Sequence, residues 1–292
     1  MSSQREPAPG IVVQGNLSRV AVGQFAERFR AEVIPLSNTF GYFCASLPMS
    51  EEVLKEYLEE PVAALPTNIA SMLPRISILL VPYLERAADR VSAKTKAKAK
   101  GTASSSMSSN SASSRAAEKI GEFVVEERPE EGKQSWASEV RFENETVLVF
   151  AFKEQDVAEY HYRLYRRLAT LVVDNLPEDS WNGYKANMRE ELNNGVHGEV
   201  DEESWQAKQA LLRRQTGVKR DTRLFEEYAR QSFIDTLTLY LHGICCDIDV
   251  ETGPRQLPSR HLRKRLTFFK GLYPPPEGYA VFPEDDDSKN SK

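Results

Sequence analysis

Three carboxylates alternate with apolar residues near the C-terminal end of the chain: Asp247, Asp249 and Glu251. If residues 244–251 form a β-strand, the two-residue period puts all three on one face, roughly 7 Å apart at each step. Carboxylate oxygens arranged in this way bind hard divalent cations such as Mg²⁺ or Mn²⁺, which serve phosphoryl transfer. The alternative interpretation is a solvated face of an edge strand.

Two of the four histidines lie where they would add ligands to such a site. His242 closely precedes the carboxylate run. His197 lies in a glycine-bounded loop next to Glu199, where a metal ligand or general base is accessible. The alternative for this loop is an ordinary interhelical turn whose acids cap the next helix. His161 adjoins an apolar helical stripe, and we interpret it as a structural histidine.

The sequence lacks the motifs of several well-known classes of site. It contains no HExxH, no CxxC pair, no GxSxG, no GxxxxGK[ST] and no GxGxxG after a strand. Zinc-finger, serine-hydrolase, P-loop and dinucleotide-binding classes therefore have no support. Cys44, Cys245 and Cys246 make a poor disulfide framework, because their number is odd and two are adjacent. We therefore expect a reducing compartment.

A basic segment between Glu251 and Glu277 contains no acidic residue. Ser259 would cap a helix with leucines on its inner face, which places the charges on its outer face. Such a patch binds phosphate or nucleic acid. Pairing with the acidic segment 122–145 or the tail 284–287 is the favoured alternative, because the whole chain is acidic. The candidate patch consists of Arg255, Arg260, Arg263, Lys264, Arg265 and Lys270.

Composition limits the classes of protein further. Of the 292 residues, 40% are hydrophobic and 28% charged, which suffices for a folded core, and the net charge of −5 gives no global attraction to nucleic acid or anionic lipid. The longest apolar run, within 76–81, is far shorter than the ~20 residues of a membrane-spanning helix. The first ten residues show no signal-peptide pattern. We therefore expect a soluble, cytoplasmic protein that does not contact a membrane.

A change in composition divides the chain. Residues 92–118 alternate lysine with small residues and then repeat serine and alanine, so they bury too little surface to offset their ordering entropy. We therefore predict a flexible N-terminus (1–10), an N-terminal α/β lobe (11–91), a disordered Ser/Lys/Ala linker or insertion (92–118), a C-terminal α+β lobe (119–283) and an acidic tail (284–292).

Hydrophobic periodicity predicts the elements that would position the candidate residues. In the first lobe, Ser50 caps a helix that Pro61 ends or kinks, and residues 76–81 form a buried strand. In the second lobe, three strands (122–127, 136–142 and 146–152) precede four helices (157–172, 184–193, 201–211 and one starting near 221). The last helix should stop at Gly243, although 236–241 also alternates like a strand.

These patterns predict a mixed α+β fold. An N-terminal α/β segment is followed by a small, largely antiparallel sheet, an amphipathic helical bundle and a short C-terminal strand or helix. We predict a non-catalytic interaction or regulatory protein whose partner is a protein, with nucleic acid reached only through the local basic segments. The alternative is a divalent-metal-dependent enzyme of phosphoryl-transfer or nucleic-acid chemistry centred on His242, Asp247 and Asp249. One cavity joining this segment to the His197 loop would favour the enzyme.

Overall fold

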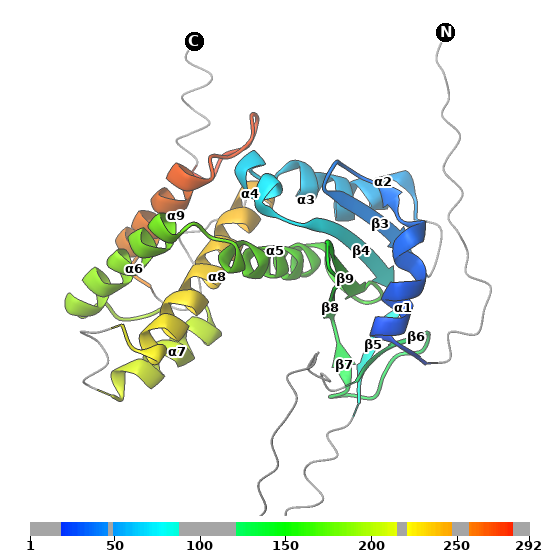
Figure 1. The fold of residues 1–292 in the computed structure, drawn as a ribbon, viewed down its shortest axis with the longest axis horizontal. Coiled ribbons are helices and arrows are strands. Elements are labelled where there is room, and N and C mark those ends of the chain that lie inside the picture. Colours follow the sequence, from blue (N-terminus) through cyan, green and yellow to red (C-terminus); the bar gives the residue numbers. More distant parts are fainter. Residues whose placement is uncertain (1–18, 46–48, 88–120, 215–220, 247–256, 283–292) are drawn as a thin grey trace, which may run out of the picture.

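The computed structural model describes residues 19–45, 49–87, 121–214, 221–246 and 257–282. Within them the chain is a mixed α+β protein, as predicted, with two sheets and a large helical region (Figure 1). The predicted flexible N-terminus, linker and tail lie outside the described residues, and so do the candidates Asp247, Asp249, Glu251 and Arg255. No helix in the described part of the chain combines the length and apolar character needed to cross a bilayer.

The larger sheet has the strand order β2-β3-β4-β9-β8. Its strands are β2 (Ile34–Pro35), β3 (Phe40–Cys44), β4 (Arg75–Val81), β9 (Glu145–Ala151) and β8 (Ala137–Arg141). β8 and β9 pair antiparallel, as their short connection predicts, whereas β4 pairs parallel with both β3 and β9. The central strands β4 and β9 are buried almost throughout, which explains their continuous apolar sequence.

The smaller sheet is antiparallel and has the order β1-β6-β5-β7. Its strands are β1 (Val20–Ala21), β6 (Glu122–Val125), β5 (Tyr83–Arg86) and β7 (Gln134–Ser135). In both sheets, strands that precede residue 88 pair with strands that follow residue 120. The two segments predicted as separate lobes therefore contribute to the same sheets.

Alternate residues of β4 face two different cores. Leu79 and Val81 pack with α1 (Val22–Phe29), which a short 3-10 turn, η1 (Arg30–Glu32), extends. Ile78 and Leu80 pack with the larger helical core. That core contains α4 (Thr67–Met72), α5 (Val157–Asp174), α6 (Glu178–Asn193), α7 (Glu202–Leu212), α8 (Arg223–Cys246) and α9 (Ser259–Leu272). Figure 1 shows α6 to α9 gathered away from the smaller sheet.

α8 is longer than the sequence predicts. The preference for helix over strand at 236–241 is confirmed, but the predicted stop at Gly243 is wrong, because α8 continues to Cys246. Glycine costs only about 1 kcal/mol inside a helix. His242 and Ile244 on either side of it are buried, and we infer that their packing outweighs that cost. The helix therefore carries His242, Cys245 and Cys246 at spacings of three and four, and residues 244–246 do not begin a strand.

Pro61 neither ends nor breaks its helix. The Ser50-capped helix runs through α2 (Glu51–Leu54), a π-helical segment η2 (Lys55–Glu59) and α3 (Glu60–Ala63). The Glu60 N–H bonds the Lys55 carbonyl, five residues back. The next acceptor in this register is the Glu56 carbonyl, but proline has no N–H to donate to it. Pro61 therefore leaves the Glu56 carbonyl available to another donor.

Candidate metal centre

α5 and the last turn of α8 bring together one imidazole and two thiols. His161 Nδ1 lies 3.1 Å from Cys246 Sγ and 3.8 Å from Cys245 Sγ. One ligand atom of each residue lies within 4.8 Å of the other two, and both cysteines are free thiols. His161 is buried, and the cysteines are partly buried. This cluster differs in every ligand from the metal site predicted from the sequence.

The Glu56 carbonyl fixes the tautomer of His161. His161 Nε2 lies 2.9 Å from the carbonyl oxygen that Pro61 leaves free. Because a carbonyl only accepts, Nε2 carries the proton, and in the neutral imidazole the Nδ1 lone pair then faces the two sulfurs. Histidines that bind metals almost always donate their other ring N–H to a carbonyl or carboxylate in this way. His161 is therefore arranged as a metal ligand as well as a core residue.

The thiols of Cys245 and Cys246 have different pKa values. A hydrogen bond from Cys246 lowers the pKa of Cys245 well below the usual thiol value, although burial opposes this. The same bond to Cys245, together with burial, raises the pKa of Cys246. Tyr165 is held in place, because its hydroxyl donates to the Pro61 carbonyl at 3.0 Å. The pair is thus set to carry one thiolate, the form of cysteine that binds metals.

Two sulfurs and one nitrogen select a class of metal. Thiolate and imidazole suit Zn²⁺ or Cu⁺, whereas Mg²⁺ and Mn²⁺ prefer oxygen. At the usual Zn–S and Zn–N bond lengths, a tetrahedral ion needs N···S separations of about 3.5 Å. The two observed separations from His161 Nδ1, 3.1 and 3.8 Å, lie on either side of this value. The cluster therefore fits a borderline-soft ion, in contrast to the Mg²⁺ or Mn²⁺ considered as an alternative for the carboxylates Asp247, Asp249 and Glu251.

The other predicted metal ligands do not converge here. His197 is exposed in the loop between α6 and α7. Glu199 is fully buried, but Arg265, Lys208 and the Tyr228 hydroxyl already contact its carboxylate. Burial alone would raise the pKa of Glu199, yet Arg265 and Lys208 outweigh this effect and hold it at about 2. Glu199 therefore has a structural role as the anion of a buried ion-pair network.

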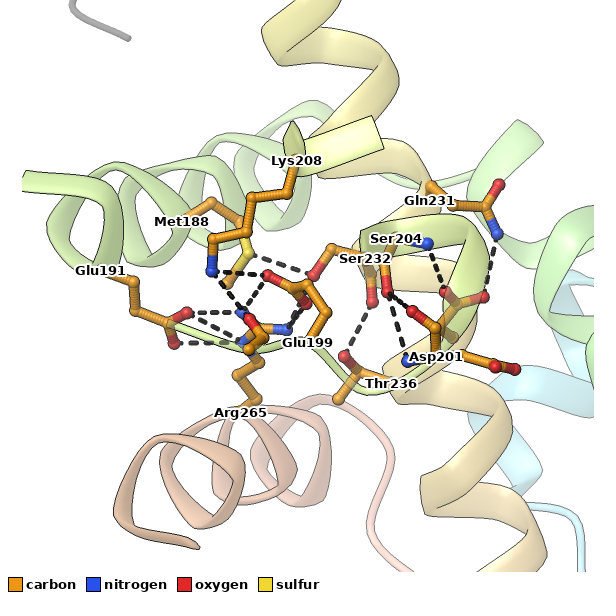
Figure 2. A network of polar contacts seen from close by, with 12 residues as sticks. Met188, Glu191, Glu199, Asp201, Ser204, Lys208, Gln231, Ser232, Thr236 and Arg265 are labelled. Atoms are coloured by element: carbon orange, nitrogen blue, oxygen red, sulfur yellow. Dashed lines mark hydrogen bonds and ion pairs between the residues drawn. The ribbon is translucent and has the colours of Figure 1, made fainter. Parts of the chain in front are cut away.

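Arg265 is the centre of that network, shown in Figure 2. Its guanidinium donates to Glu199 at 2.7 Å, to Ser232 at 2.8 Å and to Glu191 at 3.1 Å, and its exposed fraction is 0%. The prediction that the basic residues occupy the outer face of α9 is thus wrong for Arg265. Burying the guanidinium of Arg265 costs free energy of desolvation. We infer that its hydrogen bonds offset this cost and make the buried position more stable than an outward one.

The described candidates Arg263, Lys264 and Lys270 also contact the protein itself. Lys264 pairs with Glu190 of α6 at 2.7 Å. Arg263 and Lys270 lie over the ring of Phe282, at 4.6 and 5.6 Å from its centroid. Arg260 is exposed. The acidic partners of Lys264 and Arg265 belong to α6 and the loop that follows it, not to the segment 122–145 that the sequence suggested.

A second group of potential metal ligands is already occupied by an arginine. Asp201, Glu203 and Asp235 lie close together, and Arg166 sits among them at 3.7, 3.2 and 2.8 Å. Asp235 also accepts hydrogen bonds from the Ser204 backbone at 3.0 Å and from Gln231 at 2.9 Å. The guanidinium fills the position that a cation would take. Asp235 is therefore a buried aspartate of α8 whose charge is paired with Arg166, and we infer no metal site there.

Comparisons with protein-family models, curated proteins and solved structures found no match. The functional interpretation therefore depends on the geometry alone. Sequence reasoning missed all three ligands: it interpreted His161 as structural and considered Cys245 and Cys246 only as disulfide partners. The pairing of His161 with Cys245 and Cys246 depends on the packing of α5 against α8, which no local pattern reveals. The one sequence pattern that could have indicated this site is the helical spacing of His242, Cys245 and Cys246.

Proposed function

We propose that this chain is a cytoplasmic, metal-binding regulatory protein that takes a borderline-soft ion, Zn²⁺ foremost, at His161, Cys245 and Cys246. The proposal is supported chiefly by one observation: the Nδ1 lone pair of a buried histidine, fixed by the Glu56 carbonyl, faces two thiols at metal-ligand spacing. A regulatory role agrees with the position of the cluster. It joins α5, the end of α8 and, through the Glu56 and Pro61 carbonyls, the helix α2–η2–α3.

Metal binding at such a junction is coupled to packing. An ion held by α5 and α8 would fix the end of α8, the last described residues before position 247. Any free energy of binding to the folded state adds to its stability. We infer that metal occupancy controls the stability of the packing between α5 and the end of α8. We also infer that a protein partner distinguishes the metal-bound from the metal-free form. The alternative of a hard-cation enzyme depends on Asp247 and Asp249, which lie outside the described residues.

The proposal predicts metal-specific stabilisation. In thermal unfolding of the full chain, Zn²⁺ should raise the melting temperature, and a chelator should reverse the rise. At a free ion concentration of 100 Kd, the expected gain is about 2.7 kcal/mol. Mg²⁺ at the same concentration serves as the control and should have no effect, because it binds thiolates poorly. A melting temperature that ignores Zn²⁺, or follows Mg²⁺ equally, would contradict the proposal.

A further inference from the structure

The cluster has three ligands, whereas a structural zinc site has four. Building on the metal site proposed above, we propose that His242 supplies the fourth ligand through Nε2, and that the occupied site is a closed Cys₂His₂ centre. His242 precedes the two cysteines by one turn of α8, at spacings of three and four residues. Residues at these spacings lie on one side of a helix.

The first argument is the hydrogen bonding of His242. Its Nε2 atom is buried and has no hydrogen-bond partner among the described residues. In the neutral ring protonated at Nδ1, Nε2 holds a free lone pair. The residue is only 7% exposed, so bulk water does not satisfy that lone pair. A buried polar atom without a partner is costly and calls for an explanation, and a metal ion absent from the structure is one.

The second argument is the placement of the two histidine rings. The rings of His161 and His242 flank Tyr165, with centroids 6.4 and 6.2 Å from the tyrosine ring.

Occupancy would require the His242 side chain to move. Nε2 of His242 does not lie within 4.8 Å of all three cluster atoms, so its side chain must turn toward them when the ion binds. His242 also lines a pocket of about 480 Å³, together with Tyr162, Arg166 and Asp201. The turn would therefore alter the wall of this pocket. The change links metal occupancy to the surface formed by α5 and the start of α7.

A fourth protein ligand also decides the kind of site. Catalytic zinc keeps one position open for water or substrate, whereas a site with four protein ligands is closed. With His242 bound, no position remains for a reacting water. The inference therefore supports a regulatory role over an enzymatic one.

X-ray absorption spectroscopy of the full chain loaded with Zn²⁺ tests the inference. The wild type should show two sulfurs at about 2.3 Å, two nitrogens at about 2.0–2.1 Å and outer-shell scattering from two imidazoles. The variant His242→Ala should keep both sulfurs but show one imidazole, with affinity reduced at least ~10-fold. The matched control is His197→Ala, an exposed histidine, which should retain the wild-type spectrum and affinity.

The outcomes separate this inference from the proposed function. A wild-type centre with two sulfurs, one imidazole and an oxygen would overturn the role of His242 and leave the three-ligand metal site standing. Failure of the wild type to bind Zn²⁺ would overturn both. The wild-type spectrum alone decides between these results, so the test remains valid even if His242→Ala does not fold.

Discussion

Replacement of Arg265 by methionine is expected to destabilise the protein by about 3–5 kcal/mol, because it leaves a buried carboxylate without its partner. Glu191 and Glu199 are 1% and 0% exposed, and both receive hydrogen bonds from Arg265. Lys208 would still contact Glu199, so Glu191 would lose more of its stabilising contacts than Glu199 would. Urea-induced unfolding of wild type and Arg265→Met measures this difference.

The matched control is the neighbouring residue of the same helix. Lys264 makes an ion pair with Glu190 at 2.7 Å, but both side chains are about half exposed, at 44% and 57%. Lys264→Met should therefore cost no more than about 1 kcal/mol. The double variant Arg265→Met/Glu191→Gln should recover part of the loss, because it removes the uncompensated charge. Equal costs for Arg265→Met and Lys264→Met would contradict the central role assigned to Arg265.

Replacement of both thiols at the candidate site should nearly abolish zinc binding. Structural zinc sites bind with about 10–16 kcal/mol, so two of four ligands contribute roughly 5–8 kcal/mol. Cys245→Ser/Cys246→Ser should therefore weaken Zn²⁺ binding at least ~10³-fold. Competition with a chromophoric chelator of known affinity measures this change in the full chain.

Cys44 offers the control for this experiment. It lies at the end of β3 and does not belong to the cluster of His161, Cys245 and Cys246. Cys44→Ser should keep the wild-type zinc affinity, and the double serine variant should lose it. If all three proteins bound zinc equally, the ligands would have to be sought elsewhere in the chain.

Local patterns predicted those elements whose burial follows one period. The stripe of α5 is an example: Leu164, Leu168 and Val172 are all fully buried. The antiparallel pairing of β8 with β9 followed from their short connection. The parallel pairing of β9 with β4 had no such signal, because residues far apart in sequence meet there. The continuation of α8 past Gly243 was missed because tertiary packing outweighed a local stop signal.

The candidate site shows the same division between local and tertiary information. The segment around His242 was recognised as chemically unusual, but the expected ligands were the carboxylates that follow it, on the assumption of a strand. The helix instead presents His242, Cys245 and Cys246, and the remaining ligand, His161, comes from another helix. The π-helical segment before Pro61 supplies the carbonyl that orients His161. A contact among three segments that lie far apart in the sequence cannot be predicted from the local pattern of any one of them.

The most direct test of the proposed metal centre is titration of the reduced full chain with Co²⁺, followed by optical absorption. Co²⁺ takes up zinc sites and, unlike the d¹⁰ Zn²⁺ ion, reports its ligands through its spectrum. The proposed site predicts one ion per chain, a thiolate-to-cobalt charge-transfer band and the intense ligand-field bands of tetrahedral geometry, all displaced by Zn²⁺. A spectrum that stays weak and octahedral, with no charge-transfer band up to excess Co²⁺, would contradict the site at His161, Cys245 and Cys246.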